Sequence, residues 1–197
     1  MPEKIFNPLD KRNLGESIAE AIFKREVYPL VNLISFEGAG IYAIYYKGNF
    51  PLYKKISEKN KKKFLQPIYA GKAIPEGGRK GGLGTDVPIG DYLYKRLNEH
   101  RKSIEAVENL DIEDFYCRYL IVDDIWIPLG ESLLIENTKP LWNIIVDGFG
   151  NHDPGKGRYN QQVSIWDVLH PGRNWAKKLQ AGKPIDEIVK IVTDFLQ

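Results

Sequence analysis

The sequence has little of several residue types, and each shortage excludes a class of protein. Its 197 residues include one cysteine, one methionine and three histidines. A single cysteine excludes an internal disulfide framework and a cysteine-rich zinc site. Because Cys117 lies in an apolar, strand-like run, we expect it to be a buried and inert thiol.

The sequence also lacks long apolar segments. No run is long enough to cross a bilayer, and the first residues lack the pattern of a signal peptide. We therefore expect a soluble, cytoplasmic protein that contacts no membrane. The length suits one domain with a substantial core, and we expect residues 1–197 to form a single domain.

Charge is nearly balanced, at +2 overall, but the two signs are segregated along the chain. The stretch 47–80 holds ten basic residues and two acidic ones, whereas 105–136 holds nine acidic residues and only Arg118 as a base. Such segregation allows a phosphate-binding face on a nearly neutral protein. For the lysines at 59–63, plain solvation explains the charge at least as well.

Hydrophobic periodicity predicts alternating helices and strands. Helices are expected at 14–27, 91–104, 128–137 and 184–196, and strands at 40–46, 67–72 and 115–122. A polar, lysine-rich excursion at 47–66 separates the first two strands, and the glycine-rich stretch 75–90 is expected to be a loop. The order predicts an α+β fold with a small three-stranded antiparallel sheet flanked by helices.

Two tripeptides on the first two predicted strands form the most informative pattern. Gly40-Ile41-Tyr42 and Tyr69-Ala70-Gly71 resemble the paired motifs of the GIY-YIG nuclease family. Ala70 stands where the family usually has isoleucine, and the tripeptides lie farther apart than usual, so 47–66 is interpreted as an insertion. Tyrosine-rich strand pairs are common, and the tripeptides alone do not establish the resemblance.

Four further polar residues follow in the order of the family. Arg96 and His100 are four residues apart and share one helical face. Glu131 precedes a Leu-Leu-Ile run after Ser132, and Asn143 ends the sequence Lys-Pro-Leu-Trp-Asn. The resemblance covers about 40–143 and implies six catalytic residues: Tyr42, Tyr69, Arg96, His100, Glu131 and Asn143.

These residue types suit the phosphodiester hydrolysis that the resemblance implies. Glu131 is a hard oxygen ligand for one Mg²⁺ per site, with Mn²⁺ able to substitute, and Arg96 offers a fork of donors to the scissile phosphate. Tyr42 would take the proton of the attacking water, while His100 would relay that proton or hold the Tyr42 hydroxyl. Spacing does not decide which of the two is the base, although we favour Tyr42.

The other two residues would support the site, Tyr69 by positioning Tyr42 or the phosphate and Asn143 by bracing with hydrogen bonds. Each of the six residues also has an ordinary structural explanation. Strand tyrosines usually belong to a core, a carboxylate near a helix start is usually a surface group, and an asparagine after proline is usually part of a turn. The functional interpretation depends on all six occurring together.

Two other patterns are rejected. The glycines at 77–84 lack the Lys-Ser or Lys-Thr ending of a phosphate-binding P-loop. His152, Asp153 and His170 lack the spacing of a metal site.

Within the family, the chain resembles a type II restriction endonuclease that cuts the palindrome CCGCGG, through the stretches 151–155 and 169–173. That resemblance implies a restriction-modification system and a homodimer on double-stranded DNA, because each subunit would read one half-site. The nuclease core is then expected at about 38–145, with an N-terminal helical arm at 1–37 and a DNA-contacting extension at 146–197.

Basic residues are the candidates for contact with DNA. A GC-rich target needs arginine or lysine at guanine edges, although solvent exposure or phosphate contact explains each candidate at least as well. The candidates are Lys72, Arg79, Lys80, Lys156 and Arg158. Two alternatives stay open: a structure-specific repair or recombination nuclease, and a DNA-binding module without catalysis.

Overall fold

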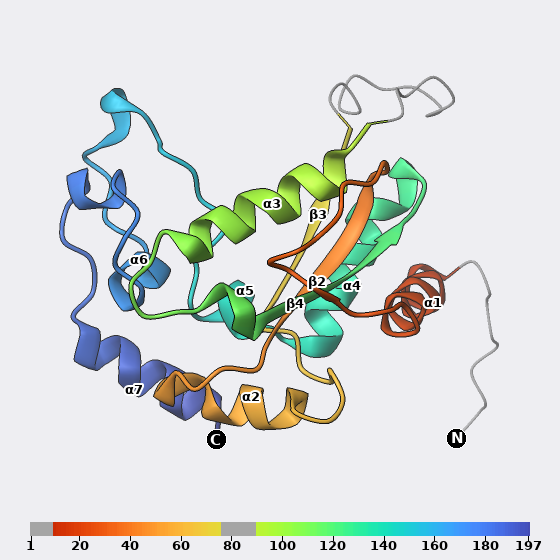
Figure 1. Cartoon of the computed structure of the whole chain (residues 1–197), viewed down its shortest axis with the longest axis horizontal. Coiled ribbons are helices and arrows are strands. Elements are labelled where there is room, and N and C mark those ends of the chain that lie inside the picture. Colours follow the sequence, from red (N-terminus) through yellow and green to blue (C-terminus); the bar gives the residue numbers. More distant parts are fainter. Residues whose placement is uncertain (1–9, 76–89) are drawn as a thin grey trace.

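The computed structural model describes residues 10–75 and 90–197, which form a sheet flanked by helices (Figure 1). The α-helices are α1 (Lys11–Phe23), α2 (Lys54–Asn60), α3 (Tyr92–Glu105), α4 (Ile127–Thr138), α5 (Leu141–Ile144), α6 (Ile165–Leu169) and α7 (Ile185–Phe195). The strands are β1 (Tyr28–Pro29), β2 (Gly40–Tyr46), β3 (Tyr69–Ala73) and β4 (Phe115–Ile121). Short 3-10 helices are η1 (Pro51–Tyr53), η3 (Ile112–Asp114), η4 (Asp124–Trp126), η5 (Lys156–Arg158) and η6 (Ala176–Lys178).

The sheet has four strands in the order β1-β4-β2-β3, and each neighbouring pair is antiparallel. The prediction of three strands is therefore wrong. The additional strand β1 consists of Tyr28 and Pro29, which pair with Cys117 and Tyr116 at one edge. Two residues carry no hydrophobic periodicity, and proline is tolerated at an edge because no ladder hydrogen bond needs its missing N–H.

Strand β2 lies in the middle of the sheet, and its seven residues are all buried. Successive side chains point to opposite faces. Ile41, Ala43 and Tyr45 pack in a cluster with residues of α1 and α4. Tyr42, Ile44 and Tyr46 join a second cluster with residues of α3 and the C-terminal part. Figure 1 shows α3 along one side of the sheet and α4 and α1 along the other. Burial on both faces explains why β2 reads as one continuous apolar run.

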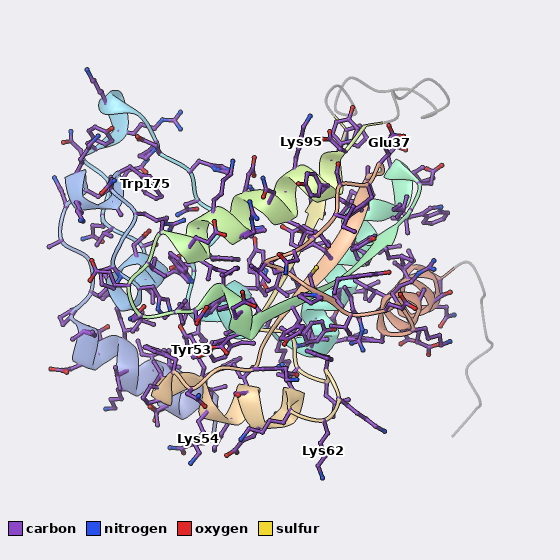
Figure 2. All side chains as sticks on the ribbon, in the orientation of Figure 1. Glu37, Tyr53, Lys54, Lys62, Lys95 and Trp175 are labelled. Atoms are coloured by element: carbon purple, nitrogen blue, oxygen red, sulfur yellow. The ribbon has the colours of Figure 1, made fainter. Side chains whose placement is uncertain are left out.

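The insertion at 47–66 contains a helix that the polar composition did not predict. Tyr53 and Ile56 are buried, and the side-chain amide of Asn60 donates to the carbonyl oxygens of Tyr46 (3.1 Å) and Gln66 (2.8 Å). The lysines remain on the outside, and Figure 2 shows Lys54 and Lys62 pointing away from the molecule on the side opposite α3.

The C-terminal part shares the main core. Phe149, Trp166, Ile188 and Val192 belong to the same buried cluster as Tyr42. Cys117 is buried as predicted, and burial raises the pKa of its thiol to about 12. Residues 146–197 therefore pack directly against the side of the sheet that carries Tyr42.

Candidate active site

A buried hydrogen bond joins the central strand to α3. The hydroxyl oxygen of Tyr42 and Nε2 of His100 are 2.6 Å apart, and both side chains are buried. Tyr42 reaches this position because even-numbered residues of β2 face α3, and His100 because it lies on the apolar face of α3 with Leu93, Leu97 and Ile104. The structure thus brings together two of the predicted catalytic residues.

The pKa values of the pair move in opposite directions. Burial, and secondarily the neighbouring Tyr69, hold the pKa of the Tyr42 phenol well above its usual value near 10, while the Arg96 cation opposes this rise. Burial, followed by the positive charge of Arg96, holds the pKa of His100 well below its usual value near 6.5. Burial therefore holds both Tyr42 and His100 in their neutral forms.

Tyr69 begins β3 and packs beside this pair. Its ring centroid lies 6.3 Å from that of Tyr42 and 5.1 Å from that of His100. Gly71, opposite Tyr42 in the strand register, makes room for the Tyr42 side chain, since a Cβ on Gly71 would lie 2.4 Å from the Tyr42 hydroxyl oxygen. The glycine that ends the second tripeptide is thus required by close packing.

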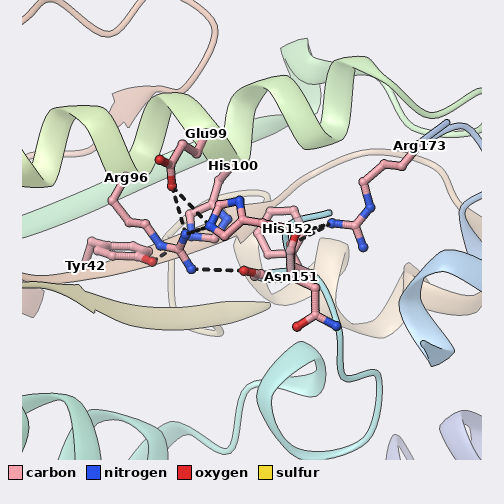
Figure 3. A network of polar contacts seen from close by, with 9 residues as sticks. Tyr42, Arg96, Glu99, His100, Asn151, His152 and Arg173 are labelled. Carbon is pink, nitrogen blue, oxygen red and sulfur yellow. Dashed lines mark hydrogen bonds and ion pairs between the residues drawn. The ribbon is translucent and has the colours of Figure 1, made fainter. Parts of the chain in front are cut away.

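Arg96 lies one turn before His100 and is held by three acceptors (Figure 3). Its Nη1 is 2.8 Å from Oε2 of Glu99 and 2.8 Å from Nε2 of His152. Its Nη2 donates to the carbonyl oxygen of Gly150 at 3.2 Å. A fully charged guanidinium therefore lies against the Tyr42–His100 pair, with its two terminal nitrogens fixed in direction.

Glu131 enters from the opposite side of β3. It lies on α4, and its Oε2 is 2.5 Å from Nζ of Lys72, which follows the second tripeptide. Both side chains are partly exposed, at 20% for Glu131 and 33% for Lys72. The Glu131 charge contributes to the raised pKa of both Tyr42 and Tyr69. Glu131 is thus within electrostatic range of the tyrosine pair.

The acidic residues of the described ranges suit a metal that takes few protein ligands. No group of three or more His, Cys, Asp or Glu residues suited to a metal occurs within 10–75 and 90–197. Mg²⁺ commonly binds through one or two carboxylates and completes its shell with water and phosphate oxygens. A single partly exposed carboxylate at Glu131 fits this donor set once the ion pair with Lys72 opens and frees the Glu131 oxygen.

Asn143 acts on the backbone of β3. Its Oδ1 accepts from the N–H of Ala70 and its Nδ2 donates to the Ala70 carbonyl, both at 2.8 Å. Asn143 lies in α5, directly after Pro140 and the buried residues Leu141 and Trp142. Because both contacts are to backbone, they do not depend on the side chain at position 70, where alanine replaces the usual isoleucine. The edge of the sheet between Tyr69 and Gly71 is fixed by this one amide.

Sequence reasoning missed the contribution of residues 148–152. Phe149 stacks on His100 with ring centroids 4.5 Å apart and planes at 18°, and Gly150 and His152 contact Arg96. The segment reads as a polar loop with no periodicity. The resemblance of residues 151–155 to the tail of a restriction enzyme marked only its last two positions. His170, considered with His152 for a metal, is buried and hydrogen-bonded to Tyr53.

The candidate DNA-binding residues lie in different environments. Lys72 is paired with Glu131, and Lys156 and Arg158 are exposed in η5. Arg79 and Lys80 lie outside the described residues. Of the DNA-binding candidates that the structure describes, only Lys72 lies beside a predicted catalytic residue.

The sheet and the grouping of Tyr42, Tyr69, Arg96 and His100 agree with the class expected from the sequence, the GIY-YIG nucleases. A family model described as the Eco29kI GIY-YIG domain matches residues 34–196. The chain belongs to this family, and its domain is a restriction-type nuclease domain that acts on DNA. The match extends well beyond 40–143 and includes the C-terminal part that packs on the site. A comparison with curated proteins gives no match. None of the helices in the described ranges is long and apolar enough to span a membrane.

Proposed function

We propose that this protein is a type II restriction endonuclease that makes double-strand cuts in a palindromic, GC-rich sequence similar to CCGCGG. The observation that carries the proposal is the buried Tyr42–His100 hydrogen bond beside the Arg96 guanidinium, in a chain that matches a restriction-type family over residues 34–196. A nuclease needs an acceptor for the proton of water and a cation for the phosphate, and these three residues supply both.

In the proposed proton path the Tyr42 hydroxyl donates to Nε2 of His100. As the oxygen of the attacking water bonds to phosphorus, the bond to the 3′ oxygen breaks and that oxygen takes a proton from solvent. The Tyr42 oxygen accepts the proton of the attacking water and passes its own proton to Nε2 of His100, 2.6 Å away. The raised pKa of Tyr42 disfavours a free phenolate, so acceptance and donation occur together.

Charge on the phosphate is neutralised by neighbouring groups. Arg96 would donate to the phosphoryl oxygens as a planar fork. Glu131 would hold one Mg²⁺ or Mn²⁺, which when bound would supply positive charge against the negative charge that develops in the reaction. Lys72, released from Glu131, would then bind a neighbouring phosphate.

The mode of DNA binding follows from the proposed target. A palindrome is read most simply by a two-fold homodimer in which each subunit cuts one strand. Residues 146–197 would contact DNA as an extension of a core at 38–145, through Lys156 and Arg158, with Arg79 and Lys80 as further candidates. The protein would act in the cytoplasm as part of a restriction-modification system.

Cleavage of a sequenced GC-rich plasmid tests this proposal. The purified protein is incubated with Mg²⁺, with EDTA as the control, and the ends of the fragments are sequenced. Discrete EDTA-sensitive fragments that share one palindrome are expected. Cutting of flaps or junctions but not of duplex DNA would indicate a structure-specific repair nuclease, and no cutting of either substrate would indicate a DNA-binding module.

A further inference from the structure

The segment 148–152 is attached to the rest of the molecule by a buried arginine. Arg173 donates from Nη2 to the carbonyl oxygen of Gly148 (2.9 Å) and from Nη1 to those of Phe149 (3.2 Å) and Asn151 (3.1 Å). The guanidinium also pairs with Asp167 at 2.6 Å, and both side chains are almost fully buried. A buried arginine with its donors satisfied in this way fixes the backbone on both sides of Gly150.

The fixed segment presents two acceptors to Arg96. The Gly150 carbonyl lies 3.2 Å from Nη2, and Nε2 of His152 lies 2.8 Å from Nη1 (Figure 3). Arginine is always protonated and only donates, so Nε2 of His152 is the acceptor of this hydrogen bond. Glu99 contacts the same Nη1 at 2.8 Å, and its carboxylate is 3.7 Å from His152 Nε2.

His152 differs from an ordinary surface histidine in how it is held. Its side chain is 63% exposed, and an exposed polar contact usually contributes little because two mobile side chains must be ordered. Here the backbone of residues 148–151 is already fixed by Arg173, and Arg96 is fixed by Glu99 and Gly150. The entropic cost of ordering the contact is therefore reduced, and its direction is set by the fold.

We propose that His152 is a positioning residue for the nuclease reaction, which holds the Arg96 guanidinium in the orientation needed by the scissile phosphate. The inference rests on the proposed function. The Gly150 carbonyl, Glu99 and His152 together hold the two terminal nitrogens of the guanidinium. Arg173 supports this arrangement indirectly, through the segment that carries His152.

Cleavage kinetics of three variants test this role. His152→Ala is expected to lower kcat about tenfold, the value of one hydrogen bond to a charged group, with DNA affinity in EDTA unchanged. His152→Gln keeps an acceptor and is expected to restore most of the lost rate. Asn137→Ala, an exposed position at the end of α4 and outside the proposed DNA-contacting extension, is the control and is expected to behave as the wild type.

A double-mutant cycle separates this role from a general effect on folding. In an Arg96→Lys background, His152→Ala is expected to have little further effect, because the group that His152 orients is gone. Equal rates for wild type and His152→Ala, or additive losses in the cycle, would overturn the inference and leave the nuclease activity standing. A wild type that cuts no DNA would overturn both. Nitrogen NMR of the imidazole gives an activity-independent check, since an Nε2–H tautomer of His152 would rule out the contact.

Discussion

The Tyr42 hydroxyl and the Nε2 atom of His100 lie 2.6 Å apart with no exposure to solvent. Burial pushes the pKa of the phenol up and that of the imidazole down, so both groups are neutral when they meet. When the phenol donates to Nε2 and a new proton arrives at the phenol from water, Tyr42 stays neutral and one positive charge is placed on His100.

Removal of the Tyr42 hydroxyl tests this relay. Tyr42→Phe keeps the ring in the core and is expected to lower the cleavage rate by about 100-fold or more, the usual contribution of positioned acid–base groups. Tyr45→Phe is the control, because Tyr45 lies on the opposite face of β2 and its hydroxyl accepts from Arg118. We expect Tyr42→Phe and Tyr45→Phe to have comparable stability but very different single-turnover cleavage rates. Equal rates in both variants would exclude Tyr42 from the chemistry.

Asn143 should contribute mainly to stability. Asn143→Ala leaves the N–H and carbonyl of Ala70 without their partner and is expected to lower the free energy of unfolding by about 2–3 kcal/mol. Asn137→Ala, exposed at the end of α4, is expected to change it by less than about 0.5 kcal/mol. Urea unfolding monitored by tryptophan fluorescence measures both. Similar values for the two variants would mean that solvent replaces the amide at Ala70 at no cost.

Two buried histidines make the fold sensitive to acid. Burial lowers the pKa of His170 to about 3 and holds that of His100 well below 6.5. Below pH 6.5 the unfolded chain binds protons that the folded protein excludes. For each pH unit below that value, each histidine lowers the unfolding free energy by about 1.4 kcal/mol. For His170 this loss continues until the pH reaches its folded pKa of about 3.

Urea unfolding between pH 7.5 and 5.5 measures this proton uptake. His170→Gln is expected to reduce the slope against pH by up to one proton, whatever its effect on stability at neutral pH. An unchanged slope would show that the folded protein accommodates a charged His170.

The elements that carry the site were predictable from local pattern. Strand β2 was predicted with its observed bounds, and α3 and α4 to within one residue at each end, because each has a strong periodicity or apolar run and a defined start. Arg96 and His100 were placed on one face by helical spacing alone. The short strand β1 and the helix in the insertion were missed, since two residues show no period and α2 is rich in lysine.

Contacts between distant segments were not predictable. Lys72 and Glu131 meet because β3 packs against α4, and no spacing rule relates a strand end to a helix in the next part of the chain. His152 and Gly150 reach Arg96 because Arg173 and Asp167, some twenty residues later, hold the segment in place. Such a site depends on a buried ion pair whose partners look like ordinary surface charges in the sequence.

Glu131 is proposed as the metal carboxylate of this nuclease, and comparing cleavage with DNA binding tests that role most directly. With Mg²⁺ and a cleavable duplex, Glu131→Gln is expected to abolish cutting while its dissociation constant for the same DNA stays within a few-fold of wild type. Glu136→Gln, exposed on the same helix, is the control and is expected to cut normally. Normal turnover by Glu131→Gln would exclude Glu131 as the metal carboxylate.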